Sequence, residues 1–354
     1  MNKKLIIGPA WVGDMVMAQT FFKILRAQDP TAQLDVVAPP ATAPLLSRMP
    51  EINNTWPIPA KHGEFGWSYR YKLGRELHGQ HYNQAYILQN SWKSALIPFI
   101  ARIPKRTSWL GEHRWGLIND IHHLDPLALP LMIQRFACLA YPRETNWHEF
   151  GAQHNLSTLP WPQLVVDEQQ RAAVLAQFNI QPSAQPILGL CPGAEFGPAK
   201  RWPAEYYAEL ASHYLKQGWA VWLFGSPKEQ DAADLIMEKT NQRCKSFVGK
   251  TKLVEAIDLM SQVSAVVTND SGLMHVAAAL NKPVIVVYGS SSPKFTPPLS
   301  HHAEILSLNL SCSPCFQREC PLGHLRCLKD LLPPQVISAV DKMISTPQHL
   351  TDLS

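Results

Sequence analysis

The feature that most constrains the fold is an alternation of short apolar segments with helical patterns, which occurs in both halves of the chain. Each apolar segment ends in small or polar residues, as strands of a parallel sheet do before a turn. Alternating strands and helices of this kind predict doubly wound α/β sheets. The segments are residues 4–8, 34–38 and 85–88 in the first half, and 187–190, 220–224, 265–268 and 284–288 in the second.

The length supports two such domains. The chain has 354 residues, and domains commonly take roughly 100–200 residues each. A softer stretch with several prolines, residues 151–185, separates the two runs of strands. We therefore expect an N-terminal domain over residues 1–170, a C-terminal domain over 171–333, and a final helix and tail over 334–354.

Composition and charge exclude several classes of protein. A net charge of +4 with dispersed cations argues against a nucleic-acid-binding protein. No apolar run approaches the ~18–20 residues that span a bilayer. Lys3 and Lys4 precede an apolar stretch that is too short and too interrupted for a signal peptide, so we expect a cytoplasmic chain. Three cysteines (Cys138, Cys191 and Cys244) stand singly in apolar contexts, as buried thiols do.

The segment TNDSGLMH, residues 268–275, places a polar turn between a buried strand and a helix of small residues. Asp270 or Ser271 would cap that helix, and Gly272 would let a ligand approach the backbone. The N–H groups at such a helix start form a binding site for a diphosphate. An ordinary capped helix is the alternative. His275, one turn into the helix, suits packing, and we include it among the candidates for donor binding.

A second polar loop, CPGAEFGPAKRWP, covers residues 191–203. Gly193 and Ala194 lie in the turn that follows a strand, and Lys200 and Arg201 precede a proline that suits the first turn of a helix. Paired cations at the end of a strand would neutralise phosphate oxygens. A solvated basic corner is the alternative. Two such loops in one half of the chain favour a nucleoside-diphosphate ligand.

The first loop of the chain, between Gly8 and Gly13, lacks the features of a phosphate-binding loop. Neither a Walker A sequence nor G-x-G-x-x-G after a strand occurs, which argues against ATP hydrolysis and hydride transfer. Asp14 follows the loop, where its carboxylate would repel a diphosphate. The same carboxylate would serve as a base in a facing domain, or it would be the N-cap of a helix beginning at Met15.

Together these stretches resemble glycosyltransferase family 9, which includes the ADP-heptose:lipopolysaccharide heptosyltransferases. The resemblance covers nearly the whole chain in the right order. It is carried by residues 8–15 (GPAWVGDM), 192–203 (PGAEFGPAKRWP), 268–275 (TNDSGLMH) and 288–299 (YGSSSPKFTPPL).

The resemblance implies a GT-B fold, in which two Rossmann-like doubly wound domains face a cleft and the final helix packs back on the N-terminal domain. It implies an inverting, metal-independent transfer of heptose from ADP-L-glycero-D-manno-heptose onto the first heptose of the lipopolysaccharide inner core. The C-terminal domain would bind ADP-heptose and the N-terminal domain the Kdo-lipid A acceptor that bears the first heptose. No cofactor would be required, and the enzyme would lie at the cytoplasmic face of the inner membrane as a peripheral protein.

The resemblance also assigns roles to residues. The catalytic carboxylate of the family falls on Asp14, its phosphate-binding lysine on Lys200, and its last nucleotide-site motif on Asp270, Ser271 and Gly272. Thr251 corresponds to a contact beside the adenine. The ribose partner should follow Phe224, and the choice stays open among Ser226, Lys228 and Glu229.

The acceptor is strongly anionic, which points to cations of the N-terminal half. The acceptor-binding candidates are Gly13, Lys93, Arg106 and Arg114; of these, Lys93 directly follows a strand and is favoured. Arg70 and Lys72 are expected to be solvated. Nearby aromatic residues suit sugar stacking or loop packing: Tyr69, Trp92, Trp109 and Trp115.

Four cysteines gather late in the chain: Cys312, Cys315, Cys320 and Cys327. Their density is typical of a structural zinc site, with His324 as a substitute ligand, although the spacing of the second pair is loose. Structural cysteines, reduced or disulfide-bonded, are the alternative.

Two other functions remain open from the sequence. The first is a different GT-B enzyme, such as another heptosyltransferase or a transferase or epimerase that uses a UDP-sugar. The second is a non-catalytic protein that binds a nucleotide sugar. The presence of both Asp14 and Lys200 argues against the second.

Overall fold

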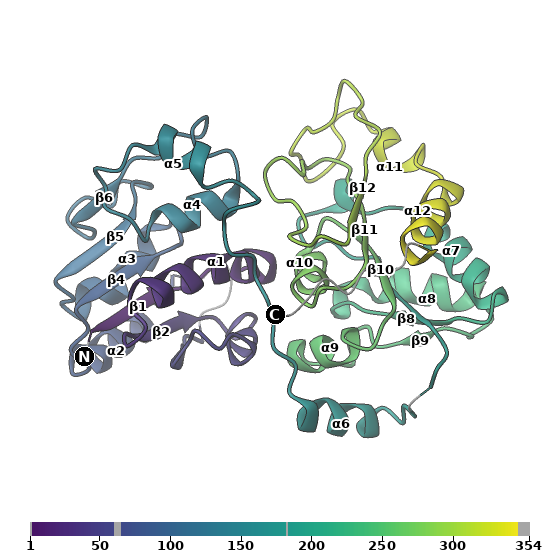
Figure 1. The fold of residues 1–354 in the computed structure, drawn as a ribbon, viewed down its shortest axis with the longest axis horizontal. Coiled ribbons are helices and arrows are strands. Elements are labelled where there is room, and N and C mark those ends of the chain that lie inside the picture. The colour runs from purple at the N-terminus through teal and green to yellow at the C-terminus, as the bar shows by residue number, and fades with distance from the viewer. Residues whose placement is uncertain (1, 60–64, 182, 346–354) are drawn as a thin grey trace. The chain divides into compact units, whose positions relative to one another are not determined.

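The computed structural model describes residues 2–59, 65–181 and 183–345. The chain forms two compact units, each built around one parallel sheet with flanking helices (Figure 1). The N-terminal unit comprises Met1–Val165 and Lys294–Thr296, and the C-terminal unit comprises Val166–Pro293 and Pro297–Ser354. In the described ranges, no helix combines the length and the apolar character needed to cross a membrane.

The N-terminal unit has a parallel six-stranded sheet in the order β3-β2-β1-β4-β5-β6. Its described elements are β1 (Lys3–Ile7), α1 (Val12–Gln28), β2 (Gln33–Ala38), η1 (Ala43–Arg48), β3 (Asn54–Pro57), α2 (Trp67–His78), β4 (Gln84–Ile87), α3 (Trp92–Ile100), β5 (Lys105–Trp109), β6 (Asp120–His122), α4 (Met132–Cys138) and α5 (Trp147–Gln153).

The C-terminal unit repeats this plan with the order β12-β11-β10-β7-β8-β9. Its described elements are α6 (Glu168–Gln177), β7 (Ile187–Cys191), η2 (Pro198–Lys200), α7 (Ala204–Lys216), β8 (Ala220–Leu223), η3 (Pro227–Glu229), α8 (Gln230–Lys239), β9 (Lys245–Ser246), α9 (Leu253–Met260), β10 (Ala265–Asn269), α10 (Gly272–Ala279), β11 (Val284–Val287), β12 (Ala303–Leu306), α11 (Arg326–Lys329) and α12 (Pro333–Ser345).

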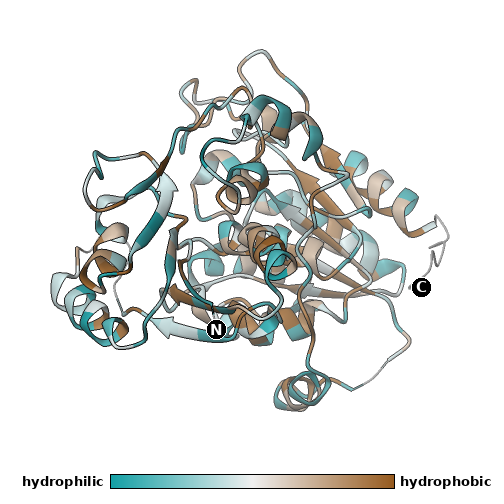
Figure 2. Ribbon diagram, turned by 60° about the vertical axis from the view of Figure 1, so that its left-hand side comes forward, coloured by the Kyte–Doolittle hydropathy of each residue, from teal (hydrophilic) through white to brown (hydrophobic). Residues whose placement is uncertain are grey.

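Burial explains why the central strands are apolar throughout. Val284–Val287 and Ala265–Asn269 are buried at every position, as expected for parallel strands covered on both faces. Several strands are accordingly hydrophobic in Figure 2, while many helix positions are hydrophilic. The prediction of two doubly wound α/β sheets is confirmed.

The final helix contributes to the core of the C-terminal unit. It packs on α7 and on β11 and β12. Val336, Ala339 and Val340 complete the core of that unit. The hydroxyl of Tyr214 also donates to Asp341 Oδ1 at 2.7 Å.

Both sheets reverse their strand order at one point. In the N-terminal unit the chain runs outward from β1 to β2 and β3, and then returns to β4 on the other side of β1. In the C-terminal unit the same reversal separates β7 from β10. Ligands of open α/β sheets bind outside the carboxyl ends of the strands at such a switch point. The topology therefore predicts one site at the β1 and β4 ends and another at the β7 and β10 ends.

Candidate functional site

The loops singled out in the C-terminal half meet at the switch point between β7 and β10. The register pairs Cys191 at the end of β7 with Thr268 near the end of β10. The turn after β7 and the turn into α10 therefore start from neighbouring positions at one edge of the sheet. The sequence motifs of residues 191–203 and 268–275 form one site.

An ion pair joins these two loops. The Lys200 ammonium lies 2.5 Å from Asp270 Oδ2, with side-chain exposures of 17% and 5%. The ring of Phe196 lies 5.1 Å from Lys200 Nζ. The pair places the partly accessible Lys200 ammonium beside the start of α10. Because little of the side chain is exposed, water screens its charge only weakly.

The N-terminus of α10 carries backbone donors for a ligand. Ser271 is the N-cap residue, and no described side chain caps the helix. The N–H groups of the first turn and the helix dipole thus point at the space beside Lys200 and Asp270. This arrangement favours an anion such as a diphosphate over the alternative of an ordinary side-chain-capped helix.

His275 lies within the same helix and is buried. Burial lowers the pKa of its imidazole to about 4; the charge of Lys200 acts in the same direction and that of Asp270 opposes it. The side chain is therefore neutral near pH 7. It can donate or accept a hydrogen bond there but contributes no positive charge.

Arg201 is exposed and turns back onto its own loop, with Nε donating to Ala194 O at 3.2 Å. Ala194 is buried, while Gly193 is half-buried. A Cβ placed on Gly193 would lie 2.4 Å from Glu229 Cγ. The loop can therefore lie against Glu229 only because residue 193 has no side chain.

Among the three residues left open for the ribose, Glu229 lies against the site. Its carboxylate is buried and accepts from Ser226 N and Ser226 Oγ, each at 2.7 Å. Lys228 is exposed and pairs with Glu195. Thr251 is half-buried and lies 3.5 Å from Phe247 O, between β9 and α9.

In the N-terminal unit, Asp14 lies at the other switch point, half-buried in the first turn of α1. The helix begins at Val12 with Trp11 as the N-cap residue, so the interpretation of Asp14 as the N-cap is wrong. Gly13 occupies the same turn. Gln89, which follows β4, donates to Gly8 O at 2.6 Å and ties together the loops after β1 and β4.

The five cations considered in the N-terminal half differ in what they can bind. Arg114 is fully buried, and its guanidinium donates to Gln89 O at 2.7 Å, to Ser108 Oγ at 3.0 Å and to further acceptors. Arg106 lies near the amino end of β5, and its Nε donates to Leu117 O at 2.6 Å. Because their donors bond to groups inside the protein, neither arginine is well placed to bind an acceptor.

Arg70 is also buried, contrary to its expected solvation, whereas Lys72 is exposed. Arg70 Nε donates to Phe65 O at 2.7 Å, and Nη1 donates to Lys93 O at 3.1 Å. Lys93 is half-buried in the first turn of α3, next to the end of β4. Among these five cations, Lys93 is the one that we retain as an acceptor-binding candidate, since it lies at the switch point of the N-terminal sheet.

The late cysteines are free thiols. Backbone N–H groups, first that of Leu325, lower the pKa of Cys320, and burial raises the pKa of Cys327. Over the part of the chain that the structure describes, no three His, Cys, Asp or Glu side chains are grouped to hold a metal ion. The expected zinc site at Cys312, Cys315, Cys320 and Cys327 therefore has no support.

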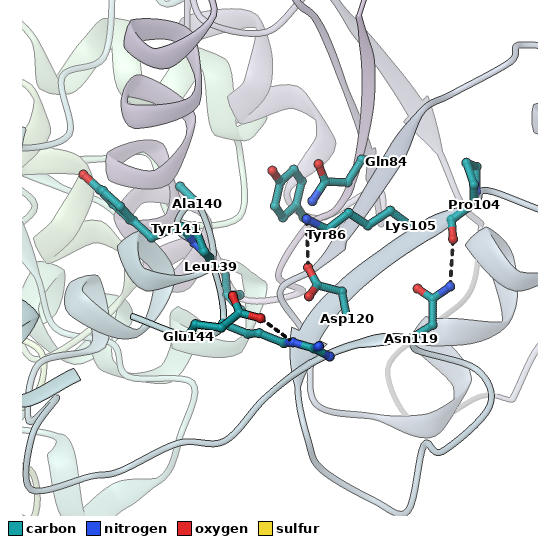
Figure 3. Close-up of a pocket in the computed structure, with 12 residues that line it drawn as sticks. Gln84, Tyr86, Pro104, Lys105, Asn119, Asp120, Leu139, Ala140, Tyr141 and Glu144 are labelled. Atoms are coloured by element: carbon teal, nitrogen blue, oxygen red, sulfur yellow. Dashed lines mark hydrogen bonds and ion pairs between the residues drawn. The ribbon is translucent and has the colours of Figure 1, made fainter. Parts of the chain in front are cut away.

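A cavity of about 470 Å³ lies elsewhere, at the amino ends of β4, β5 and β6 (Figure 3). Its charged lining is already paired, with Lys105 Nζ 3.3 Å from Asp120 Oδ2 and Arg143 Nε 2.8 Å from Glu144 Oε1. It opens at the edge of the sheet opposite Asp14 and Lys93, so it is not the candidate active site.

Comparisons with known proteins show the family to which the chain belongs. The model of glycosyltransferase family 9 (heptosyltransferase) matches residues 70–326. The chain is 45% identical over 350 residues to lipopolysaccharide heptosyltransferase 2 of Escherichia coli K12. The alignment covers 97% of this chain and 98% of that protein. The enzyme of the same name from Salmonella typhimurium is 44% identical over 351 residues, covering 97% and 99%.

The chain belongs to glycosyltransferase family 9. A solved structure of E. coli ADP-heptose lps heptosyltransferase II superposes with a TM-score of 0.86 at 43% identity, over 97% of this chain and 98% of that chain. The GT-B fold and the assignment as a glycosyltransferase are thereby confirmed. Membership of this family of enzymes also decides against the non-catalytic binding protein.

Two residues of the site were not identified from the sequence. Asn269 has the sequence context of a turn residue, although it is buried at the junction of the two loops. Glu229 was one of three open choices for the ribose. Pro227 and the Ser226-to-Glu229 spacing were the available signal, because S-x-x-E is a capping box and fixes the glutamate in space.

Proposed function

We propose that this family 9 glycosyltransferase is a heptosyltransferase II. It would transfer L-glycero-D-manno-heptose from ADP-heptose onto the first heptose of the lipopolysaccharide inner core. The observation that carries the proposal is the Lys200–Asp270 pair at the start of α10, in a chain 45% identical over almost its full length to an enzyme of that name.

The proposed donor site, at Lys200 and the start of α10, would stabilise a departing diphosphate. ADP leaves with negative charge on its β-phosphate, and the Lys200 ammonium with the N–H groups of α10 would stabilise that charge. Arg201 adds a second cation on the same loop. These fixed groups supply the positive charge that a divalent cation supplies in other transferases, so we propose transfer without a metal.

The adenosine would lie toward β8 and β9. Glu229 is held by Ser226 against the Gly193 loop, which makes its carboxylate the favoured partner of the ribose hydroxyls. Thr251 is the proposed contact beside the adenine.

The acceptor side would use Asp14 as the base. Its carboxylate would remove the proton from the attacking sugar hydroxyl. An ordinary aspartate, with a pKa near ~3.9, is a weak base, and it suffices when the proton leaves late as the anomeric carbon becomes cationic. A single carboxylate opposite the leaving group gives one displacement and inversion of configuration. Lys93 and Gly13 are the proposed acceptor contacts.

The first experiment is an assay of ADP release with EDTA present, for wild type and Asp14→Asn. The acceptor is Kdo-lipid A that bears the first heptose. We expect release by the wild type, inversion at the new bond by NMR, and a loss of about 10²-fold or more in the variant. Absence of release by the wild type, or release from a UDP-sugar instead, would overturn the assignment. Full activity in Asp14→Asn would remove Asp14 as the base.

We also propose that the enzyme works in the cytoplasm, at the membrane surface that holds its acceptor. An aromatic row supports this: Phe65, Trp67, Tyr71 and Trp92, each 40–50% exposed. The rings stack along the row, with Phe65 5.9 Å from Trp92 and 6.1 Å from Trp67. Because their faces turn toward one another, they present apolar edges outward, which suits a lipid interface better than sugar stacking.

The aromatic row lies at the same edge of the sheet as Asp14, since α2 and α3 both begin beyond the carboxyl ends of strands. Vesicles containing anionic lipid should sediment the wild type and leave Phe65→Ala/Trp67→Ala in solution. Activity on a deacylated, soluble acceptor should be equal in the two proteins. A selective loss on the soluble acceptor would assign the row to sugar binding instead.

A further inference from the structure

Asn269 is the last residue of β10 and is completely buried. Its side-chain amide donates to Pro192 O at 2.8 Å and to Gly193 O at 3.2 Å. Its Oδ1 accepts from Trp202 N at 3.0 Å and from the hydroxyl of Tyr207 at 3.1 Å. Both donors and both acceptor positions of the amide are therefore used.

These four bonds join three segments that are distant in the sequence. Pro192 and Gly193 form the turn after β7. Trp202 immediately precedes the N-cap residue of α7 and Tyr207 lies in the first turns of that helix, and Asn269 itself precedes the turn into α10. Each segment carries a residue of the candidate donor site within two positions of the bond: Gly193 itself, Lys200 before Trp202, and Asp270 after Asn269.

Only an amide satisfies this arrangement. The backbone on one side offers two carbonyl oxygens, which need donors, and the other side offers an N–H and a hydroxyl, which need an acceptor. A carboxylate would place an anionic oxygen against the two carbonyls. An aliphatic residue would remove all four bonds in the interior, where each unmade bond is costly, and the Tyr207 hydroxyl would keep Cys191 O, at 3.3 Å, as its partner.

We propose that Asn269 is the positioning residue of the donor site, which holds the Gly193 turn, Lys200 and Asp270 at the spacing that a nucleoside diphosphate requires. The inference rests on the proposed function only for the identity of the ligand. Asn269 is internal, and it acts on the ligand through the three loops.

ADP binding is the appropriate measurement, because it needs neither acceptor nor turnover. In calorimetric titrations at pH 8, Asn269→Asp should bind ADP at least about ten-fold more weakly than the wild type. The matched control is Gln134→Glu in the N-terminal unit. Gln134 is also a buried amide that donates to two carbonyls, Gly151 O at 3.2 Å and His154 O at 2.9 Å. Gln134→Glu should lower the melting temperature and leave ADP affinity unchanged.

A pH series separates positioning from general damage. As the pH falls from 8 to 5.5, the new buried carboxyl of Asn269→Asp becomes protonated and again donates to one of the carbonyls. The affinity of the variant relative to wild type should therefore recover. Burial keeps Tyr207 and Cys191 protonated throughout this range by raising the pKa of each, and His275 stays neutral. The remaining charged groups nearby, Lys200, Asp270 and Glu229, are present in both proteins.

Tyr207→Phe provides a milder test, because it keeps the ring and removes the hydroxyl that lies 3.1 Å from Asn269 Oδ1 and 3.3 Å from Cys191 O, at the end of β7. We expect a smaller loss of ADP affinity with an unchanged fold by circular dichroism. Equal ADP affinity in wild type, Asn269→Asp and Tyr207→Phe would overturn the positioning role. A wild type that does not bind ADP would instead overturn the proposed function, so the two failures are distinct.

Discussion

At the scale of single residues, the Lys200–Asp270 ion pair determines how much positive charge the proposed donor site offers to a ligand. Asp270 is nearly buried and Lys200 is partly accessible, so the charge of the lysine is neutralised within the protein until a ligand arrives. A diphosphate beside the start of α10 would share the ammonium with Asp270. Lysine is suited to this exchange because its compact charge sits on a flexible stem.

Replacing Lys200 by Met tests this role, since the change keeps the length and removes the charge. We expect kcat/KM for ADP-heptose to fall by about 10²–10³-fold, because the leaving diphosphate loses a preorganised cation. Steady-state kinetics measure the effect. The matched control is Lys216→Met, an exposed lysine at the end of α7 in the same unit, which should retain wild-type kinetics.

His275 predicts a pH dependence of stability. Its pKa is about 4 in the folded chain, against 6.5 for an unperturbed histidine, because the ring is buried. The unfolded chain therefore binds more protons between pH 6.5 and pH 4. Stability should be complete above pH 6.5 and fall through this interval, by about 3 kcal/mol in total from this residue.

Urea unfolding at several pH values checks this expectation. His275→Gln, which cannot titrate, should give a flatter profile than the wild type below pH 6.5. His123→Gln, at an exposed histidine of the N-terminal unit, should leave the profile unchanged. A wild-type slope that survives in His275→Gln would assign the effect to other groups.

At the scale of elements, the cysteine-bearing segment supports the loop that carries Lys200. Ala199 N donates to Arg318 O at 3.0 Å, and Phe316 N donates to Ser290 O at 2.6 Å. The segment thereby joins the 197–200 loop to the turn after β11. Gly197 allows this contact, because a Cβ there would lie 2.5 Å from Arg318 O.

Gly197→Ala should therefore push the new methyl group against the backbone carbonyl of Arg318. A backbone atom cannot move aside as easily as the end of a flexible side chain. We expect a destabilisation of about 1–3 kcal/mol by denaturant unfolding, together with weaker ADP binding. Gly79→Ala is the control, because its nearest contact would be 3.7 Å away and its φ is −72°. A similar cost for both substitutions would show that loss of glycine, not the contact with Arg318, is responsible.

At the scale of the whole molecule, each unit has its own sheet and its own core. The donor loops all lie in the C-terminal unit, and Asp14 and Lys93 lie in the N-terminal unit. A ligand that binds one unit stabilises that unit against unfolding, by a free energy that grows with the logarithm of the ligand concentration divided by Kd.

Differential scanning calorimetry with ADP tests this division. At a free ADP concentration of about 100 Kd, the stabilisation of about 2.7 kcal/mol should raise one transition by roughly 5–10 °C and leave the other in place. Lys200→Met should abolish most of the shift. A single transition would mean that the units unfold together, and an equal shift of two transitions would mean that ADP binds to both units; either result would overturn the division.

Much of the fold was predictable from local patterns. An apolar run of a few residues indicates a buried strand, and the small polar residues after it indicate where the strand ends. The two sheets and the loops after β1, β7 and β10 were predictable from such segments. Lys200 and Asp270 were selected in the same way, because they follow strands whose carboxyl ends share one edge.

The tertiary structure alone decided which polar side chains serve the protein and which remain for a ligand. Arg106, Arg114 and Arg70 look like surface cations in sequence, yet their donors bond carbonyls that the fold brings near. Asn269 looks like a turn residue, yet it joins three loops. The physical reason is that strand periodicity is written in neighbouring residues, whereas the partners of a hydrogen bond are set by segments far apart along the chain.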